Sequence, residues 1–290
     1  MKTKKFFLTT TALLLFSLSL ASTGFAGSNE QEASNLNNDV EILYSNKELG
    51  GPPINYNRFK TSQENYTPIV ERSSIATVYD ENGNIVDTHV IEKNTTETED
   101  NNINSRASSG RLCRVLVAVD EEYRAKHSNW MSLTESIVEG ADDAFNRDFG
   151  IDLTVAAYQY WNSSGSSGKQ ILNNLMSSYS SNSYDFVIGF TAEPDFVDNY
   201  GIQISGTAQE VTSNPIYGSY AVNWDQNDVY SDWHSLQHEI SHLYSLQHDI
   251  SGPSPLCIMN YGTMYSTSYW DTDHYNQIAV RVGWYGTSIN

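Results

Sequence analysis

The chain has 290 residues and is strongly acidic, with 16 Lys and Arg against 35 Asp and Glu and a net charge of −19. A surface of this charge argues against nucleic acid and anionic membrane as partners, because both are negatively charged. The acidic charge is compatible with bound Ca²⁺, although no segment has the pattern of a calcium-binding loop.

Residues 1–26 have the pattern of a secretory signal peptide. Three lysines precede an apolar run over residues 6–20, and residues 24–26, Gly-Phe-Ala, resemble a cleavage site. The run is too short for a stable transmembrane helix, and no later stretch approaches the length that a span needs. We therefore expect a secreted, extracellular and soluble protein.

Residues 27–106 are rich in Asn, Glu, Thr and Ser, so we expect them to add little to a core and to be partly disordered. Within them, residues 77–86 are expected to form a hairpin with Asn82-Gly83 in its turn. Their position predicts a propeptide that is removed between residues 102 and 110, with a plain linker as the alternative. Because the segment holds no cysteine, a cysteine switch cannot provide latency.

Residues 107–290 have the size of one domain and carry alternating strand and helix patterns. This alternation predicts an α/β layer with parallel strands joined by right-handed crossovers. The expected strands are residues 111–119, 151–161, 185–191, 201–208 and 217–223. The expected helices are residues 130–149 with a stop at Gly150, 169–179, 230–246 with Ser231 and Asp232 as possible caps, and 273–284.

Three histidines stand at the spacing of a metal site. His238 and His242 are four residues apart, so on a helix their imidazoles lie on one face and can converge on one ion. His248 is the expected third ligand, provided that the helix ends near Ser245. Catalytic Zn²⁺ takes neutral imidazole nitrogen at about 2.0–2.1 Å and keeps one position open. Glu239 is rotated away from the histidine face and is the expected general base.

This pattern, H-E-x-x-H-x-x-S-x-x-H-D followed by Cys-Ile-Met-Asn-Tyr at residues 257–261, resembles the zinc signature of the metzincin metalloendopeptidases. Asp249 and the Cys-Ile-Met resemble the adamalysin branch, whereas Met-x-Tyr resembles the astacin branch. Such a mixture is similar to a small group of secreted metzincins from bacilli. The resemblance implies a twisted, mostly parallel sheet with an antiparallel edge strand, an active-site helix, a methionine turn and a C-terminal helix.

Three residues near the motif carry further expectations. Ser245 replaces the family's glycine, and serine in a left-handed conformation costs on the order of 1 kcal/mol, so the placement of His248 depends on it. By resemblance to astacins, Tyr261 is a candidate catalytic residue that stabilises an oxyanion, with packing beneath the turn as the alternative. Met259 is expected to be an apolar floor beneath the histidines. By the same resemblance, the strand at residues 201–208 pairs with an extended peptide substrate.

Other ligand sets were compared on the same residues. Thermolysin-like enzymes take a third ligand from a downstream glutamate, but Glu239 is the last glutamate of the chain. A motif shifted to His234 would lack the glutamate base, so His234 is expected to be solvated or to lie beside the ligands. An aspartate remains an alternative third ligand, although His248 is preferred. The candidates are Asp249, Asp271 and Asp273.

The two cysteines, Cys113 and Cys257, are expected to form one disulfide in an exported protein. The bond would tie the first strand of the domain to the methionine turn. By closing the long loop between the two cysteines, the bond would stabilise the fold by about 4–5 kcal/mol, because it lowers the entropy of the unfolded chain. The alternative is that one thiol serves as a metal ligand, which a three-histidine site does not need.

The sequence thus predicts a secreted, monomeric, zinc-dependent endopeptidase with protein or peptide substrates. One alternative is a zinc-binding protein of the same fold without proteolytic activity. Glu239 argues against it, because a purely structural zinc site needs no base and usually closes its fourth position with a protein ligand. The other alternative is a zinc amidase that acts on cell wall, but nothing outside the site resembles a wall-binding repeat.

Overall fold

The computed structural model describes residues 51–55, 67–94 and 110–289. The predicted signal peptide (1–26) and residues 102–109 of the predicted cleavage region lie outside these ranges. The described strands are β1 Ser74–Tyr79, β2 Ile85–Ile91, β3 Gly110–Val119, β4 Ile151–Tyr160, β5 Phe186–Thr191, β6 Gly206–Ala208, β7 Ser219–Trp224 and β8 Thr287–Ile289. The described helices are α3 Glu121–Lys126, α4 Trp130–Phe149, α5 Gly168–Ser178, α6 Val229–Leu243 and α7 Thr272–Ala279, with short 3-10 helices at Met264–Ser266 and Val282–Trp284.

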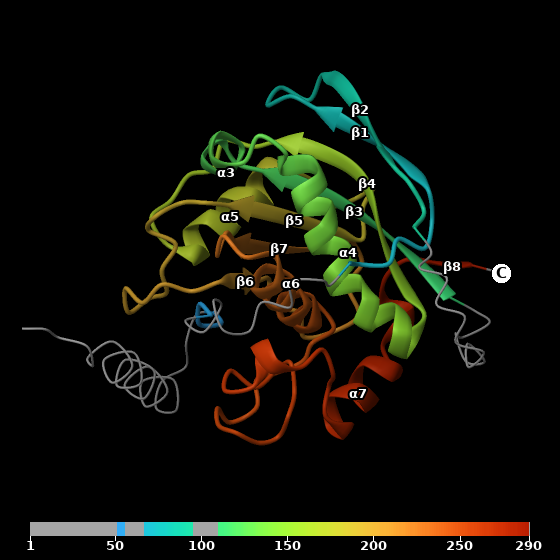
Figure 1. Ribbon diagram of the computed structural model, residues 1–290, viewed down its shortest axis with the longest axis vertical. Helices are drawn as coiled ribbons and strands as arrows, with labels where there is room; N and C mark the ends of the chain where they lie inside the picture. Colours follow the sequence, from blue (N-terminus) through green and yellow to red (C-terminus); the bar gives the residue numbers. More distant parts are fainter. Residues whose placement is uncertain (1–50, 56–66, 95–109, 290) are drawn as a thin grey trace, which may run out of the picture.

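One twisted sheet of eight strands organises these elements (Figure 1). The strand order is β2-β1-β4-β3-β5-β7-β6, and β8 pairs with the start of β3. The pairings β1 with β4, β4 with β3, β3 with β5, and β5 with β7 are parallel. The outer strands β2 and β6 and the short β8 pair antiparallel. This mixed α/β architecture confirms the predicted, mostly parallel sheet with an antiparallel edge strand.

Both faces of the central strand β3 are buried, because its consecutive residues point alternately into two cores. Val115, Val117 and Val119 pack into the larger core, which includes the apolar faces of α4 and α6. Leu116 and Ala118 pack into the smaller core beneath α5. A central parallel strand therefore needs an unbroken apolar run, which is what the sequence has at these positions. The segments from the end of α6 to α7 lie on the side of α6 away from the sheet (Figure 1).

Most predicted elements agree with the structure to within one or two residues. The helix at residues 130–149 is α4, and Gly150 ends it at φ 65°, a left-handed conformation that favours glycine. The predicted hairpin is β1 and β2, with Gly83 at φ 80° in the turn. The predicted strand at 201–208 is shorter, because only residues 206–208 pair continuously with β7.

The hairpin changes the expectation for residues 27–106, which were predicted to add little to the core. β1 pairs in parallel with β4, with Thr77 opposite Ala157, so it extends the main sheet. Ala76, Val78 and Ile91 are fully buried in the larger core. The low-core expectation is therefore wrong for this hairpin, since its burial depends on a strand that comes much later in the chain.

Two helix ends also differ from the prediction. The N-cap of α6 is Asp228, whose side chain accepts a hydrogen bond from Ser231 N at 3.2 Å. The expected cap Ser231 lies inside the helix, and so does Asp232, which accepts a hydrogen bond from Gln226 N instead. The expected helix at 273–284 ends at residue 279, and β8 rather than a helix is the last described element.

The predicted disulfide is wrong, because Cys113 and Cys257 are both free and buried in separate surroundings. Cys113 lies in β3, where its sulfur leaves no room for a side chain at Gly286. The Cys257 sulfur accepts hydrogen bonds from the backbone N–H groups of Met259 and Asp271. Each thiol is thus enclosed by its own neighbours.

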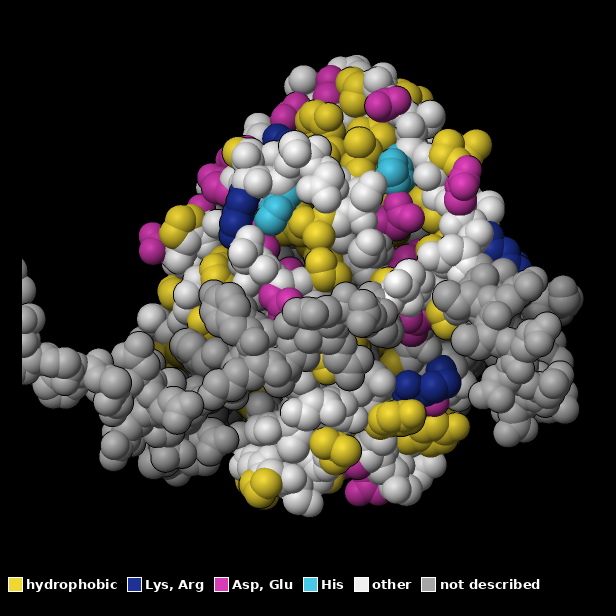
Figure 2. Space-filling model, viewed as in Figure 1, with side chains coloured by type: hydrophobic (Ala, Val, Ile, Leu, Met, Phe, Trp, Pro, Cys, Tyr) yellow, Lys and Arg dark blue, Asp and Glu magenta, His cyan; other side chains and the backbone are white. Residues whose placement is uncertain are grey.

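Acidic side chains are dispersed over the face in Figure 2, with basic side chains in few places. From residue 107 onwards the sequence has 7 Lys and Arg against 21 Asp and Glu, a net charge of −14. Among the described residues, no helix is both long and apolar enough to cross a membrane.

Some carboxyl groups lie inside the protein, between α4 and β4. Oxygen atoms of Asp142, Asp152 and Glu71 lie within 4.8 Å of one another, and Glu139 is nearby and buried. Burial, followed by the negative charge of Glu71, raises the pKa of Glu139 to about 9. Burial also raises the pKa of Asp142 well above its usual value. These groups hold protons in the folded state that the unfolded chain releases.

The contribution of these carboxyl groups to the stability of the fold should therefore fall as the pH rises. A carboxyl whose pKa is raised by folding stabilises the fold fully below the unfolded pKa, and this contribution is lost as the pH rises toward the folded pKa. For Glu139 the window runs from about 4.5 to about 9. Glu139→Gln should flatten the decline in denaturant midpoint between pH 5 and pH 9, whereas Glu121→Gln, at an exposed position, should not. An unchanged slope in Glu139→Gln would contradict the assignment.

Candidate metal centre

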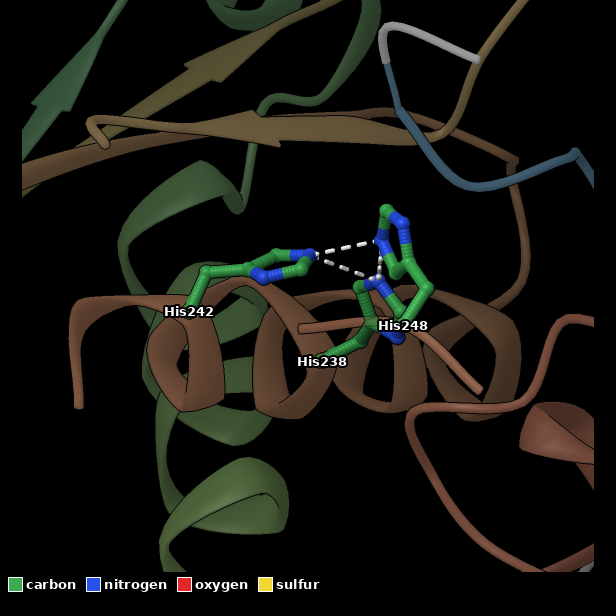
Figure 3. Close-up of side chains that lie close together, drawn as sticks. All are labelled: His238, His242 and His248. Atoms are coloured by element: carbon green, nitrogen blue, oxygen red, sulfur yellow. Dashed lines mark hydrogen bonds between the residues drawn. The ribbon is translucent and has the colours of Figure 1, made fainter. Parts of the chain in front are cut away.

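The helix α6 and the chain that follows it bring the three predicted histidines together (Figure 3). His238 Nε2 lies 3.1 Å from His242 Nε2 and 3.1 Å from His248 Nε2, and the remaining pair is 2.8 Å apart. Ligand nitrogens at about 2.0–2.1 Å from a tetrahedral ion are about 3.3 Å apart, so the spacing is close to that of a zinc site. The three side chains form one of the groups with atoms close enough to share an ion.

The hydrogen bonds of the other ring nitrogens fix which nitrogens carry protons. His238 Nδ1 lies 2.8 Å from Ile258 O, and His242 Nδ1 lies 2.8 Å from Leu246 O. A carbonyl oxygen only accepts, so both Nδ1 atoms must donate, and in a neutral ring Nε2 then presents a lone pair. Two Nε2 lone pairs thus face each other at 3.1 Å with no proton between them. A cation at this point resolves the repulsion.

The surroundings keep these imidazoles neutral. Burial, followed by the nearby His242 and His248, lowers the pKa of His238 well below its usual value. Burial also lowers the pKa of His242 to about 4. Neutral imidazole is the form that binds metal, so the donor set fits a zinc ion at neutral pH.

The chain reverses after α6 through an unusual serine. Ser245 has φ 63°, one of two described non-glycine residues in the left-handed region. Its N–H donates to His242 O at 2.7 Å, and Leu246 then provides the carbonyl that holds His242 Nδ1. Arg281 donates to Tyr244 O at 2.8 Å and to Ser245 O at 3.2 Å. The sequence did not reveal this role of Arg281, because the turn and the arginine are far apart along the chain.

Glu239 lies beside the histidines and is almost completely buried. Within the described residues its Oε1 atom has no hydrogen-bond partner. Burial raises the pKa of the Glu239 carboxyl well above its usual range. Strand β6 approaches this side chain closely, since a Cβ at Gly206 would lie 2.7 Å from Glu239 Oε1. Gly206 is therefore needed for the edge strand to pass the carboxylate.

Residues 257–261 form the turn beneath the histidines. Ile258 O accepts the His238 hydrogen bond, and Met259 O accepts a hydrogen bond from Asp249 N at 3.1 Å. Met259 itself is fully buried in the larger core, as expected for an apolar floor. The Tyr261 hydroxyl lies 2.9 Å from His248 Nε2, so this side chain reaches the metal centre.

His234 and the aspartates occupy other positions. His234 is buried, so of the two alternatives predicted for it the solvated one is wrong. Its Nδ1 donates to Tyr230 O at 2.7 Å, its ring stacks on Trp233, and burial lowers its pKa to about 3. Asp249 and Asp271 belong to a separate group with Cys257 and His274, and Asp273 belongs to neither group.

A pocket of about 350 Å³ opens beside the histidines. It is lined by Gly51, residues 207–211, Glu239, His242 and residues 246–248. A second pocket of about 440 Å³ shares residues 207–210 with it. The chain that follows β6 thus forms a wall of both pockets.

Residues 51–55 lie beside β6 (Figure 1, blue), and Gly51 lines this pocket. Pro53 forms an antiparallel bridge with Ile204, and Ser205 N donates to Pro52 O at 2.7 Å. The segment is mostly buried, and a Cβ on Gly51 would collide with Gly206 O. A piece of the predicted propeptide therefore pairs with the chain just before the edge strand.

Comparison with known proteins agrees with this geometry. The reprolysin-type family model described as Metallo-peptidase family M12 matches residues 109–272, more than half of the chain. The chain belongs to this family. Members of family M12 are metallopeptidases that use zinc, and the matched region contains the three histidines and Glu239. A sequence search of curated proteins returns no match for this family M12 chain.

Solved structures with a similar fold include one from a "chaperone-substrate complex", at 13% identity and a TM-score of 0.47. Another is metalloproteinase-II from Bacteroides fragilis, at 15% identity and a TM-score of 0.41. The alignments cover 61% and 59% of this chain. They cover 35% and 52% of the two matched chains, so this chain spans about a third and about half of their lengths.

The left-handed serine gives a prediction on stability. A left-handed conformation costs a non-glycine residue about 1–2 kcal/mol. Glycine avoids this cost, but it gives back part of the gain in stability because it raises the conformational entropy of the unfolded chain. Ser245→Gly should therefore raise the free energy of unfolding by up to about 1 kcal/mol, and Ser245→Val should lower it by at least about 1 kcal/mol. Denaturant unfolding measures both changes.

Ser213 offers a matched control, because it is exposed and does not have a positive φ. Ser213→Gly should leave stability unchanged or lower it slightly. Equal effects of glycine at residues 213 and 245 would contradict the importance of the left-handed turn.

Proposed function

We propose that the chain is a secreted zinc endopeptidase of family M12, of the bacillus type that combines adamalysin-like and astacin-like motifs. The observation that carries this proposal is the convergence of His238, His242 and His248 Nε2 atoms beside the buried Glu239. Three protein ligands leave one position open, as in catalytic zinc sites. A zinc ion bound there supplies Lewis-acid activation of the scissile carbonyl and of the attacking water.

Glu239 acts as the general base and then as the general acid. It takes a proton from the attacking water and passes it to the nitrogen of the leaving amine, so that the peptide bond breaks without a free strong acid or base. Burial raises the pKa of this carboxyl above its usual range, which makes its ionised form a stronger proton acceptor than an exposed glutamate. Tyr261 donates its hydroxyl hydrogen to the developing oxyanion, a role supported by the 2.9 Å distance between its hydroxyl and His248 Nε2.

The substrate is an extended peptide that lies along β6. This edge strand offers backbone groups on the side away from β7, and Gly206 keeps the approach to Glu239 open. The two pockets that share residues 207–210 are suited to hold side chains of such a peptide. Residues 52–53 use the same mode of binding, since they bond to residues 204–205 next to the edge strand.

The chain is made as a zymogen. A signal peptide at residues 1–26 directs export, and residues 27–106 form a propeptide whose residues 51–55 occupy the substrate groove. The buried contacts of Pro52 and Pro53 beside the catalytic pocket support this role. Latency then comes from steric occupation of the groove and not from a cysteine.

The general-base role of Glu239 can be tested by hydrolysis of casein with the processed enzyme. Glu239→Ala should lower kcat/KM by at least about 10²-fold, because a positioned proton-transfer group contributes about 10²–10⁴-fold. The zinc content should stay at the wild-type value, since Glu239 is not a ligand. Glu121→Ala, at an exposed glutamate, should behave like the wild type.

Other outcomes of this assay separate the alternatives. If the wild type holds zinc at the histidines but cleaves no protein, a non-proteolytic zinc protein replaces the proposal. If it releases amide-linked fragments from cell wall and leaves casein intact, it is an amidase. Equal activities of wild type and Glu239→Ala would remove the base assignment.

The zymogen proposal can be tested with one added methyl group. Gly51→Ala should displace residues 51–55 from the groove, because its Cβ would collide with Gly206 O. The unprocessed full chain carrying Gly51→Ala should cleave a short fluorogenic peptide at least about tenfold faster than the unprocessed wild type. This factor corresponds to a loss of about 1.4 kcal/mol or more in the binding free energy of the segment in the groove.

Gly283→Ala is the matched control, because a Cβ there meets nothing within 4 Å. Electrophoresis before and after the assay verifies that the chains stay unprocessed. Equal rates for Gly51→Ala and wild type would show that the segment does not block the groove.

A further inference from the structure

A second group of metal-binding side chains lies next to the histidine site. Asp249, Cys257, Asp271 and His274 each offer an atom within 4.8 Å of the others. His274 Nδ1 lies 3.4 Å from Cys257 Sγ, 3.1 Å from Asp271 Oδ1 and 3.6 Å from Asp249 Oδ2. In a tetrahedral zinc site of nitrogen, oxygen and sulfur ligands, neighbouring donors are about 3.3–3.6 Å apart, so these distances fit one ion.

Few protons are available to hold the side chains of this group together. His274 Nδ1 carries at most one proton, and the shortest contact of this ring nitrogen is to Asp271 Oδ1. The same oxygen atom caps α7, because it accepts a hydrogen bond from the backbone N–H of His274. The Asp249 Oδ2 atom faces the same nitrogen, is inaccessible to solvent, and has no hydrogen-bond partner among the described residues. Cys257 Sγ faces it as well. His274 Nδ1–H and the Cys257 thiol together supply two protons to this group, whereas one cation would contact all four ligand atoms.

Burial raises the pKa of the Cys257 thiol to about 12, and two backbone N–H groups that point at the sulfur offset part of this effect. Asp271 N and Met259 N both point at Cys257 Sγ, at 3.3 Å and 3.4 Å. Backbone N–H groups directed at a buried sulfur stabilise a metal-bound thiolate. A thiolate and an imidazole with two carboxylates suit Zn²⁺ and exclude the hard ions Ca²⁺ and Mg²⁺, which prefer oxygen ligands only.

We propose that Asp249, Cys257, Asp271 and His274 bind a second zinc ion, which is structural. Binding replaces the thiol proton of Cys257, which passes to solvent as the Zn–S bond forms. Four protein ligands close the coordination sphere, whereas the histidine site keeps one position open. The second zinc ties together the residue after His248, the turn at residues 257–261 and the start of α7. It thus does the cross-linking for which a disulfide of Cys257 was expected.

The proposal goes beyond the catalytic site and does not depend on it. The full chain, loaded with Co²⁺ in place of zinc, should show a near-ultraviolet thiolate-to-cobalt charge-transfer band. Cys113→Ser should retain the band, because Cys113 is the only other cysteine and lies elsewhere in β3. Cys257→Ser should lose the band. Metal analysis should give two ions per chain for wild type and one for both Cys257→Ser and His274→Ala.

A variant of the first site keeps the two claims distinguishable. His242→Ala should also bind one ion, but it should keep the thiolate-to-cobalt band. If only the histidine site fails to bind metal, the wild type should show the band and hold one ion. X-ray absorption of the wild-type zinc protein covers the case in which Cys257 variants do not fold. It should contain a sulfur scatterer at about 2.3 Å from zinc, averaging about half a sulfur per zinc ion.

Two results would overturn the second site. One is a wild-type chain with no sulfur scatterer and no thiolate-to-cobalt band, which would leave an ion pair of His274 with the aspartates. The other is a band that persists in Cys257→Ser.

Discussion

The repulsion between unprotonated histidine nitrogens is the constraint around which this structure is built. His238 and His242 each commit Nδ1 to a backbone carbonyl, so their Nε2 lone pairs face each other at 3.1 Å. A cation between the rings would remove this repulsion, and its binding would then contribute to the folding free energy. Burial strengthens the constraint, because it prevents the rings from escaping repulsion by taking up protons.

Distant parts of the chain provide the supports for this constraint. The carbonyl for His238 comes from the turn at residues 257–261, and the carbonyl for His242 comes from the turn after α6. That second turn depends on Ser245 in a left-handed conformation and on hydrogen bonds from Arg281. The group around Cys257 joins the same two turns to α7. Substitutions well away from the histidines are thus expected to change metal affinity.

The sequence predicted those features that depend on local spacing. Helix α4 was predicted to the residue, because its apolar period and Gly150 are both local signals. The metal-binding pattern at residues 238–248 was readable for the same reason. Features that depend on contacts between distant segments were missed: the pairing of β1 with β4, the strand β8 on β3, and the group that joins Asp249 to His274. Two cysteines in one chain suggested a disulfide, but only tertiary structure shows that each thiol lies in its own surroundings.

Anomalous diffraction at the zinc edge, from crystals of the full chain grown without chelators, tests the central claim most directly. We predict a strong peak at about 2.0–2.1 Å from the Nε2 atoms of His238, His242 and His248, with Glu239 outside the coordination sphere. A map without a peak between the three imidazoles, or with Glu239 as a ligand, would contradict it.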